Sequence, residues 1–471
     1  MDRWLKAALD YIPRWLDFQM RVSEQPGLAV AIAHQGRIAL EEAFGHADLA
    51  TGEALTPRHR MRVASHSKAF TAAAVMRLVE DGKLRLDDRA GEHVEGLHPA
   101  VARVTVAQLL SHSAGLTRDG DDTGQWSDRR PFLNEEELRA ALREAPVIDP
   151  NTRFKYSNHG YGLAGLIIEA ASGEPYDTYV ERAIVRPVGL DETTPDIKLP
   201  AGASLARGHS GKLPLGRRVI IPGENPTRAL AAATGFVSTA RDLARFFGQL
   251  APDAKKSVLT AESRREMVRK QWRDPQLSIE RYYGLGLMSG QLHGWDWFGH
   301  SGGFQGFITR TLVLPEQELA VSALTNASDG WSHGWLEGMV HILATFAKKG
   351  APDRKLASWG GRWWSLGGAT DLVPMGDKVM VAAPGLLSPF LDASEITVTS
   401  KDRGKIMLAP GGGAHGQGVR RVRNKDGEVA EVWLGGGKGL PEADLAREMR
   451  DRYEAQGTGG AVRRLRVAAR R

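Results

Sequence analysis

The sequence of 471 residues contains no cysteine, and this absence removes several kinds of chemistry at once. Disulfide bridges, catalytic thiolates, zinc sites with cysteine ligands and iron–sulfur clusters are all excluded. The chain also lacks a run of about 18 apolar residues, so the sequence predicts no membrane-spanning helix. It contains no His-Glu-x-x-His pattern, and we expect neither a metal nor another cofactor.

The N-terminal segment lacks the features of a secretory signal. Such a signal needs an uninterrupted apolar core of about 7–15 residues followed by a small-residue cleavage site. Residues 1–22 instead place apolar side chains at helical spacing with charges between them, which predicts an amphipathic helix packed on a domain. From this chain we expect a cytoplasmic protein.

Positive and negative charges nearly balance over most of the chain. The net charge is +6 at pH 7, but five arginines lie close to the C-terminus, at positions 463, 464, 466, 470 and 471. Neither interleaved aromatic residues nor a nucleic-acid-binding motif accompanies them. We therefore interpret the basic end as a solvated tail or an edge strand, and expect no nucleic-acid partner.

The first 348 residues predict an α+β domain. Strand patterns occur near both ends of this region, at residues 27–44 and 295–324, while helical patterns fill the middle. The segment from Ser65 to Val79 is apolar on nearly every face, so we expect a buried helix that begins at Ser65. This order of elements indicates helices inserted between two halves of one antiparallel sheet.

A second domain is predicted after a linker. Residues 349–355 break both the helical and the strand periodicity. Beyond them, short alternating runs are separated by turns that contain glycine and aspartate, at intervals typical of antiparallel β structure. We therefore expect a separate antiparallel β-barrel or sandwich over residues 352–471.

One short segment in the first domain, FGHSGGF at residues 298–304, fits two different chemistries. Its Gly299-x-Ser301-x-Gly303 pattern is that of the nucleophile elbow of α/β-hydrolases, which would make Ser301 the nucleophile. An elbow requires a strand before the serine and a helix after it, whereas the residues that follow predict a β-hairpin. We therefore expect this strand to serve as one wall of a site, with His300 rather than Ser301 as its important residue.

Two spacings elsewhere supply a nucleophile and a base. Ser65 and Lys68 lie one helical turn apart on one face, and desolvation in so apolar a helix would lower the pKa of the lysine. Tyr156 and Asn158 form the only Tyr-x-Asn in the chain; a tyrosine can relay protons, and an asparagine can anchor a lysine and a substrate amide. Taken singly, each pair also fits a structural role, a helix N-cap or a turn.

Three motifs together resemble those of the serine β-lactamase and penicillin-binding-protein superfamily: Ser-x-x-Lys at residues 65–68, Tyr-x-Asn at 156–158 and His-Ser-Gly at 300–302. The closest resemblance is to its branch of class C β-lactamases, D-alanyl-D-alanine carboxypeptidases, esterases and D-aminopeptidases. The loop LLSHSAGL at residues 109–116 is similar to one common in that branch. The resemblance implies a β-lactamase-like sheet flanked by helices, with an all-helical subdomain, and a lipocalin-like barrel after it.

The resemblance also implies a set of site residues. A serine would form an acyl-enzyme, a lysine and a tyrosine would share general-base and general-acid work, and an asparagine would orient the lysine and the acyl group. A histidine would line the opposite wall, and a backbone N–H would complete the oxyanion hole with that of the serine. In this order, the residues implied are Ser65, Lys68, Tyr156, Asn158, His300 and Gly303.

The expected substrate class depends on one residue that differs from those of many β-lactamases in the superfamily. His300 stands where many β-lactamases of the superfamily carry lysine, so near neutral pH the site attracts a carboxylate less. This favours a serine hydrolase of small amides, D-amino-acid peptides or esters. The alternatives are a β-lactamase and a catalytically silent peptide-binding or scaffold protein on the same fold. The expected partner is a small ester, amide or short peptide, without a membrane, and a homo-oligomer is compatible with the barrel domain.

Overall fold

The computed structural model describes residues 1–275 and 279–454, so the arginine-rich end predicted as a tail or edge strand lies outside the described residues. Within these ranges the chain forms two large antiparallel sheets, one of nine strands and one of eight. The chain divides into two compact units, one of Ser23–Glu337 and one of Met1–Val22 with Gly338–Arg471. Each unit has its own sheet.

The first helix belongs to the second of these units. Helix α1 (Arg3–Ser23) is amphipathic, as expected, and the hydroxyl of its Tyr11 donates to Asp371 Oδ2 at 3.0 Å. The carboxylate of Asp371 also accepts from Arg362 Nε at 2.7 Å. The domain limits predicted from the sequence, 1–348 and 352–471, stay a prediction; they differ from the two units chiefly in the placement of this helix.

The nine-stranded sheet contains both the early and the late strands of the first unit. The strand pattern expected at residues 27–44 forms β1 and β2, and β1 pairs with β13 in antiparallel register, so distant parts of the chain meet within one sheet. In spatial order the strands are β3 (Glu53–Ala54), β2 (Arg37–Asp48), β1 (Gly27–His34), β13 (Leu319–Thr325), β12 (Phe307–Leu314), β11 (Trp295–Phe304), β10 (Met288–Leu292), β9 (Arg281–Tyr283) and β8 (Trp272–Arg273).

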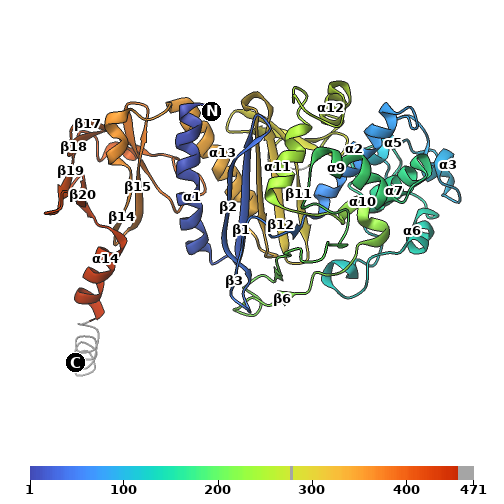
Figure 1. The fold of residues 1–471 in the computed structure, drawn as a ribbon, viewed down its shortest axis with the longest axis horizontal. Helices are drawn as coiled ribbons and strands as arrows, with labels where there is room; N and C mark the ends of the chain where they lie inside the picture. The colour runs from blue at the N-terminus through green and yellow to red at the C-terminus, as the bar shows by residue number, and fades with distance from the viewer. Residues whose placement is uncertain (276–278, 455–471) are drawn as a thin grey trace. The chain divides into compact units, whose positions relative to one another are not determined.

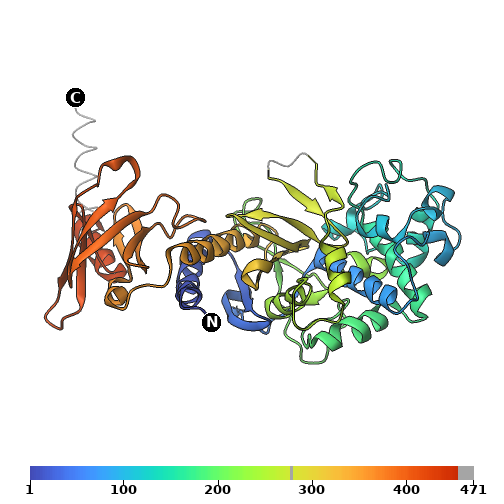
Figure 2. The same cartoon turned by 90° about the horizontal axis from the view of Figure 1, so that it is seen from above.

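The middle of the chain forms the helices of this unit (Figures 1 and 2). Helices α2, α5, α7 and α10 pack on one another as a helical subdomain, while α11 packs on β1, β12 and β13. The longer helices are α2 (Ser67–Glu80), α6 (Glu135–Leu142), α7 (Asn158–Ser172), α11 (Ala240–Gln249) and α12 (Ala261–Val268); the shorter ones are α3 (Ala90–His93), α4 (Pro99–Ala102), α5 (Val106–Leu110), α8 (Tyr176–Val180), α9 (Arg186–Val188) and α10 (Ala231–Thr234).

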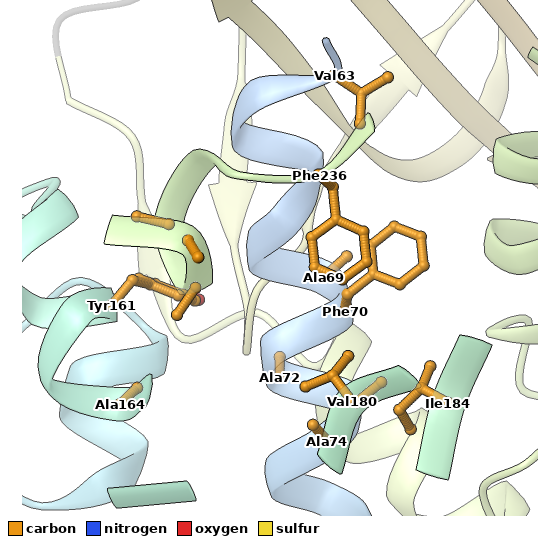
Figure 3. Packing of buried hydrophobic residues seen from close by; sticks show 14 of the residues in the cluster. Val63, Ala69, Phe70, Ala72, Ala74, Tyr161, Ala164, Val180, Ile184 and Phe236 are labelled. Atoms are coloured by element: carbon orange, nitrogen blue, oxygen red, sulfur yellow. The ribbon is translucent and has the colours of Figure 1, made fainter. Parts of the chain in front are cut away.

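Helix α2 is the centre of the core (Figure 3). Its residues Ser67 to Met76 are all buried, which explains why the segment is apolar on nearly every face. The ring of Phe70 stacks between those of Phe236 and Phe246, at centroid distances of 4.2 and 3.8 Å. This packing holds the N-terminal end of α2, and with it the turn before the helix, in a fixed position.

The C-terminal strands form a nearly closed antiparallel barrel, which confirms the predicted fold class. Neighbours in the chain are neighbours in the sheet, and Trp364 and Leu440 exchange backbone hydrogen bonds of 2.7 and 2.9 Å between the first strand and the end of the last. Apolar side chains fill the interior, where the guanidinium of Arg421 lies 4.2 Å over the Trp359 ring. The strands are β14 (Gly361–Ser365), β15 (Gly368–Met375), β16 (Lys378–Ala382), β17 (Ser394–Ser400), β18 (Arg403–Leu408), β19 (Gly418–Arg423), β20 (Val429–Leu434) and β21 (Gly437–Gly439).

Two further helices are α13 (Ser332–Lys349), before these strands in the chain, and α14 (Glu442–Met449), after them. Across the two described ranges, none of the helices has both the length and the apolar character that a bilayer crossing requires.

Candidate active site

Ser65 lies in a short 3₁₀ turn, η1 (Ala64–His66), and α2 begins two residues later than the sequence predicted. The backbone of Ala64 is left-handed, with φ of +46°. Such a conformation costs a residue with a Cβ about 1–2 kcal/mol. It is held here by the Ser67 hydroxyl, which donates to the carbonyl oxygen of Ala64 at 2.5 Å. Strain of this kind is concentrated at functional sites.

The structure brings four of the predicted site residues together. Ser65 Oγ lies 3.1 Å from Lys68 Nζ and accepts a hydrogen bond of 3.0 Å from the Tyr156 hydroxyl. Lys68 Nζ also donates to Asn158 Oδ1 and to the carbonyl oxygen of Ala233, both at 2.8 Å. The Ser65 hydroxyl is therefore positioned between an amine and a phenol.

Burial sets the protonation of both groups. It holds the pKa of Lys68 well below its usual range, with the charge of Asp119 opposing this shift. Burial raises the pKa of Tyr156, which therefore stays protonated, although its hydrogen bond to Ser65 has the opposite effect. The pair thus combines a lysine that loses its proton easily with a tyrosine that keeps its own.

Tyr156 and Asn158 are positioned by the start of α7. Ser157 is the N-cap, and its Oγ accepts from the backbone N–H of Gly160 at 2.8 Å. The backbone N–H of Ser157 donates to His112 Nδ1 at 3.1 Å, and the His112 ring lies 4.0 Å from that of Tyr156. The LLSHSAGL loop, which contains His112, therefore holds the segment with the Tyr-x-Asn motif in place.

The glycine-rich strand β11 contributes to the same site as Ser65, but the side chain of its His300 is buried. His300 is 1% exposed, and its Nε2 lies 3.0 Å from the Tyr283 hydroxyl. Side chains alternate between the two faces of a strand, so Ser301 and Gly303, rather than His300, line the cavity that opens over Ser65. Burial lowers the pKa of His300 well below its usual range, so the ring is neutral.

The strand also excludes the elbow geometry. Ser301 lies within β11, where it pairs with Arg310 of β12 in antiparallel register. No helix follows: β11 ends at Phe304 and β12 begins at Phe307. The hairpin expected from the sequence, with its turn at residues 315–318, is formed by β12 and β13 and is confirmed.

A cavity of about 640 Å³ opens over Ser65 and contains charged residues that the sequence did not predict. Arg118 pairs with Asp119 at 3.1 Å, and Arg281 donates through Nε to Asp274 at 2.8 Å. Asp119 is 6% exposed. The one sequence signal for it is its position three residues after the LLSHSAGL loop, and this spacing specifies no contact.

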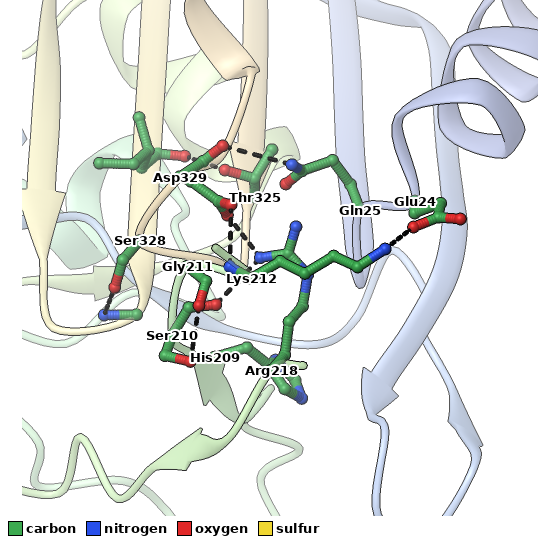
Figure 4. A network of polar contacts seen from close by, with 12 residues as sticks. Glu24, Gln25, His209, Ser210, Gly211, Lys212, Arg218, Thr325, Ser328 and Asp329 are labelled. Carbon is green, nitrogen blue, oxygen red and sulfur yellow. Dashed lines mark hydrogen bonds and ion pairs between the residues drawn. The ribbon is translucent and has the colours of Figure 1, made fainter. Parts of the chain in front are cut away.

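A second cavity of about 440 Å³ shares Trp126 and Gly303 with the first. Its wall includes the apolar residues Ile220 and Ile221, which form β6, the partner of β5 (Gly208–His209). The β5–β6 hairpin is held by a polar network in which Arg218 donates to the carbonyl oxygen of Ser210 at 2.9 Å and pairs with Asp329 (Figure 4).

Among the described residues, one group of three side chains could hold a metal ion, Asp88, Glu92 and His93. Their ligand atoms lie within 4.8 Å of one another. None of the three lines the cavity over Ser65.

The comparisons with known proteins agree with this geometry. Residues 15–334 match the family described as Beta-lactamase. The chain belongs to this family, within the β-lactamase and penicillin-binding-protein-like superfamily of serine hydrolases. Penicillin-binding protein 4 of Amycolatopsis lactamdurans is 30% identical over 322 residues, which are 64% of this chain and 81% of that protein. The proteins named Protein flp from two strains of Staphylococcus aureus, N315 and Mu50, are 26% identical over 187 residues, and the chain spans only 37% of their length.

Two solved structures are similar over most of their length. The octameric penicillin-binding protein homologue from Pyrococcus abyssi is 25% identical, with a TM-score of 0.64, and the match covers 92% of this chain and 99% of that one. The D-stereospecific amidohydrolase from Streptomyces sp. is 26% identical, with a TM-score of 0.56, over 70% of this chain and 95% of that one.

Proposed function

We propose that the protein is a serine hydrolase that forms an acyl-enzyme on Ser65 and acts on small amides, D-amino-acid peptides or esters. The observation that carries the proposal is the position of Ser65 Oγ, 3.1 Å from Lys68 Nζ and 3.0 Å from the Tyr156 hydroxyl, at a cavity of about 640 Å³. A hydroxyl with a base on one side and an acid on the other is arranged for acyl transfer.

In the first step, neutral Lys68 takes the proton of Ser65 as Oγ attacks the substrate carbonyl. The backbone N–H groups of Ser65 and Gly303 would hold the oxyanion, a contribution worth about 2.7–4 kcal/mol per donor in other hydrolases. Tyr156 then gives its proton to the leaving amine or alcohol as the bond to the acyl carbon breaks, and the Lys68 ammonium returns a proton to the tyrosine. Water attacks the acyl-enzyme in a second step with the same groups.

The charges in the cavity support an uncharged or zwitterionic substrate. Both arginines in the wall are paired with an aspartate, Arg118 with Asp119 and Arg281 with Asp274. His300 is buried and neutral, so it adds no positive charge. The similarity to an amidohydrolase described as D-stereospecific supports amides of D-amino acids in particular.

A β-lactamase is the second candidate, and one observation favours it. The relative at 30% identity is named a penicillin-binding protein, and the chain spans 81% of it. Penicillin recognition in that protein makes a β-lactam a necessary member of any substrate panel.

The proposal is tested by steady-state hydrolysis of p-nitrophenyl esters, nitrocefin and the p-nitroanilides of D- and L-alanine. We expect turnover of D-alanine p-nitroanilide or of an ester, and its loss in Ser65→Ala. Ser301→Ala is the matched control, because Ser301 lines the same cavity but lies on β11. Turnover of nitrocefin alone would establish the β-lactamase. Full activity of Ser65→Ala would contradict both candidate functions, because each requires an acyl-enzyme on Ser65.

The proposal includes a homo-oligomer. The similar protein from Pyrococcus abyssi is described as octameric, and the match covers 92% of this chain. Light scattering during gel filtration tests this directly: the measured mass should be a multiple of 51.3 kDa, and a mass equal to one chain would contradict it.

A further inference from the structure

The amine of Lys68 has more acceptors around it than a neutral amine has protons. Three oxygens lie within 3.1 Å of Nζ: Ser65 Oγ, Asn158 Oδ1 and the carbonyl oxygen of Ala233. A neutral amine has two N–H donors and one lone pair, whereas the ammonium has three donors. If both N–H groups of the neutral amine go to the two carbonyl-type oxygens, the lone pair is directed at the Ser65 hydroxyl.

This arrangement depends on which end of the Asn158 amide faces the lysine. A carbonyl oxygen can only accept, so Oδ1 takes an N–H from Lys68 and leaves the lone pair for Ser65. The Nδ2 group can only donate, and a flipped amide would take the lone pair itself. The base is therefore available to Ser65 only in one orientation of the amide.

One side chain fixes that orientation. Asn158 Nδ2 donates to Asp119 Oδ1 at 2.7 Å, and an ionised carboxylate can only accept. Asp119 is 6% exposed, and its second oxygen accepts from Arg118 Nε at 3.1 Å. A flipped amide would bring Oδ1 against the carboxylate, two acceptors in contact, which is strongly unfavourable in a buried site.

We propose that Asp119 is a positioning residue, which locks the Asn158 amide so that Lys68 directs its lone pair at Ser65. The assignment rests on the proposed function, because it concerns the activation of the same serine. It adds to the Ser, Lys, Tyr and Asn motif residues a buried carboxylate that no motif in the sequence indicates.

Asp119 also acts on Lys68 through its charge. The titratable and charged groups that face Lys68 are Asp119, Arg118, Tyr156, Tyr161, His112 and His300. Burial keeps both tyrosines protonated and both histidines neutral. Among the described groups just named, Asp119 therefore holds the one negative charge, and this charge raises the pKa of Lys68 against the effect of burial.

Two substitutions separate the two roles. Asp119→Asn removes the charge but keeps an oxygen that can accept from Asn158 Nδ2. Asp119→Ala removes the charge and the acceptor together. Asp121→Asn is the matched control, because Asp121 is an exposed aspartate of the same loop.

The readout is the rate constant at which a fluorophosphonate probe labels Ser65, measured over a range of pH, with thermal unfolding as the check of folding. Labelling of the wild type should rise with pH as Lys68 loses its proton. In Asp119→Asn this rise should move to lower pH, because the charge that raises the lysine pKa is gone, while the plateau stays close to wild type. In Asp119→Ala the plateau should fall at least about 10-fold.

The outcomes separate this assignment from the proposed function. If the wild type is labelled at Ser65 but both Asp119 variants follow the Asp121→Asn profile, Asp119 does not position the base and the assignment is overturned. A loss of plateau rate without any shift of the pH profile in a folded Asp119→Asn protein would also contradict it. If the wild type is not labelled at Ser65, the proposed function falls, and the assignment with it.

Discussion

Gly302 of β11 lies directly against the carbonyl oxygen of Val63: a Cβ built on Gly302 would stand 2.1 Å from that oxygen. Val63 precedes the turn that contains Ser65, so this contact holds the strand and the Ser65 turn at a fixed separation. The next glycine is different, because a Cβ on Gly303 would meet its nearest atom, in the Ile308 side chain, at 3.7 Å. These two adjacent glycines of β11 therefore face different constraints.

Gly302→Ala should lower the free energy of unfolding by about 1–3 kcal/mol, because neither the backbone of β11 nor that of Val63 can move far in a packed interior. Gly303→Ala should leave the free energy of unfolding close to that of the wild type. Urea unfolding monitored by tryptophan fluorescence measures both. Equal stability of the two variants would contradict the close contact with Val63.

Lys68→Arg should abolish activity although arginine is also a long basic side chain. A guanidinium stays protonated in proteins and cannot take the proton of Ser65. In the wild type, activity should rise with pH through the lowered pKa of Lys68, because only the neutral amine is a base. The pH dependence of kcat/KM for the best substrate measures this, with exposed Lys83→Arg as the control. Retained activity in Lys68→Arg would exclude the lysine as the base.

Tyr156→Phe should lower kcat by about 10²–10⁴-fold, the contribution of a positioned acid or base. The ring, which lies 4.0 Å from that of His112, is preserved, so the thermal midpoint should change little. Tyr453→Phe, at a tyrosine that is 52% exposed, is the control for loss of a hydroxyl. Wild-type kcat in Tyr156→Phe would mean that the hydroxyl takes no part in the chemistry.

Phe70→Ala should cost about 3–5 kcal/mol of unfolding free energy, because it opens a cavity between two stacked rings. The partners are Phe236 and Phe246, at centroid distances of 4.2 and 3.8 Å. Leu213→Ala, where the side chain is 93% exposed, should change the same quantity by less than about 0.5 kcal/mol. Similar losses in the two variants would show that the Phe70 stack is not part of the core.

The local parts of the site could be predicted from the sequence. Ser65 and Lys68 are one turn apart, and helical geometry places their side chains on one face. The hairpin after Ser301 followed from strand periodicity, and it excluded the elbow correctly. The exact start of α2 did not follow, because a 3₁₀ turn with left-handed Ala64 replaces the first helical residues.

The tertiary parts could not be predicted in the same way. Strand alternation says that His300 and Ser301 face opposite sides, but only the packing of β11 decides which side is the cavity. The contact between Asp119 and Asn158 joins residues far apart in the chain, and no spacing encodes it. The amphipathic pattern of α1 predicts a buried face without naming the domain that covers it.

The proposed mechanism requires that Ser65 becomes acylated. The most direct test is peptide mass spectrometry after brief incubation with a p-nitrophenyl ester, on the wild type and on Ser65→Ala. We expect one acyl adduct on the peptide that contains Ser65 and none in the variant. An adduct on Ser301, or an adduct that persists unchanged in Ser65→Ala, would contradict this mechanism.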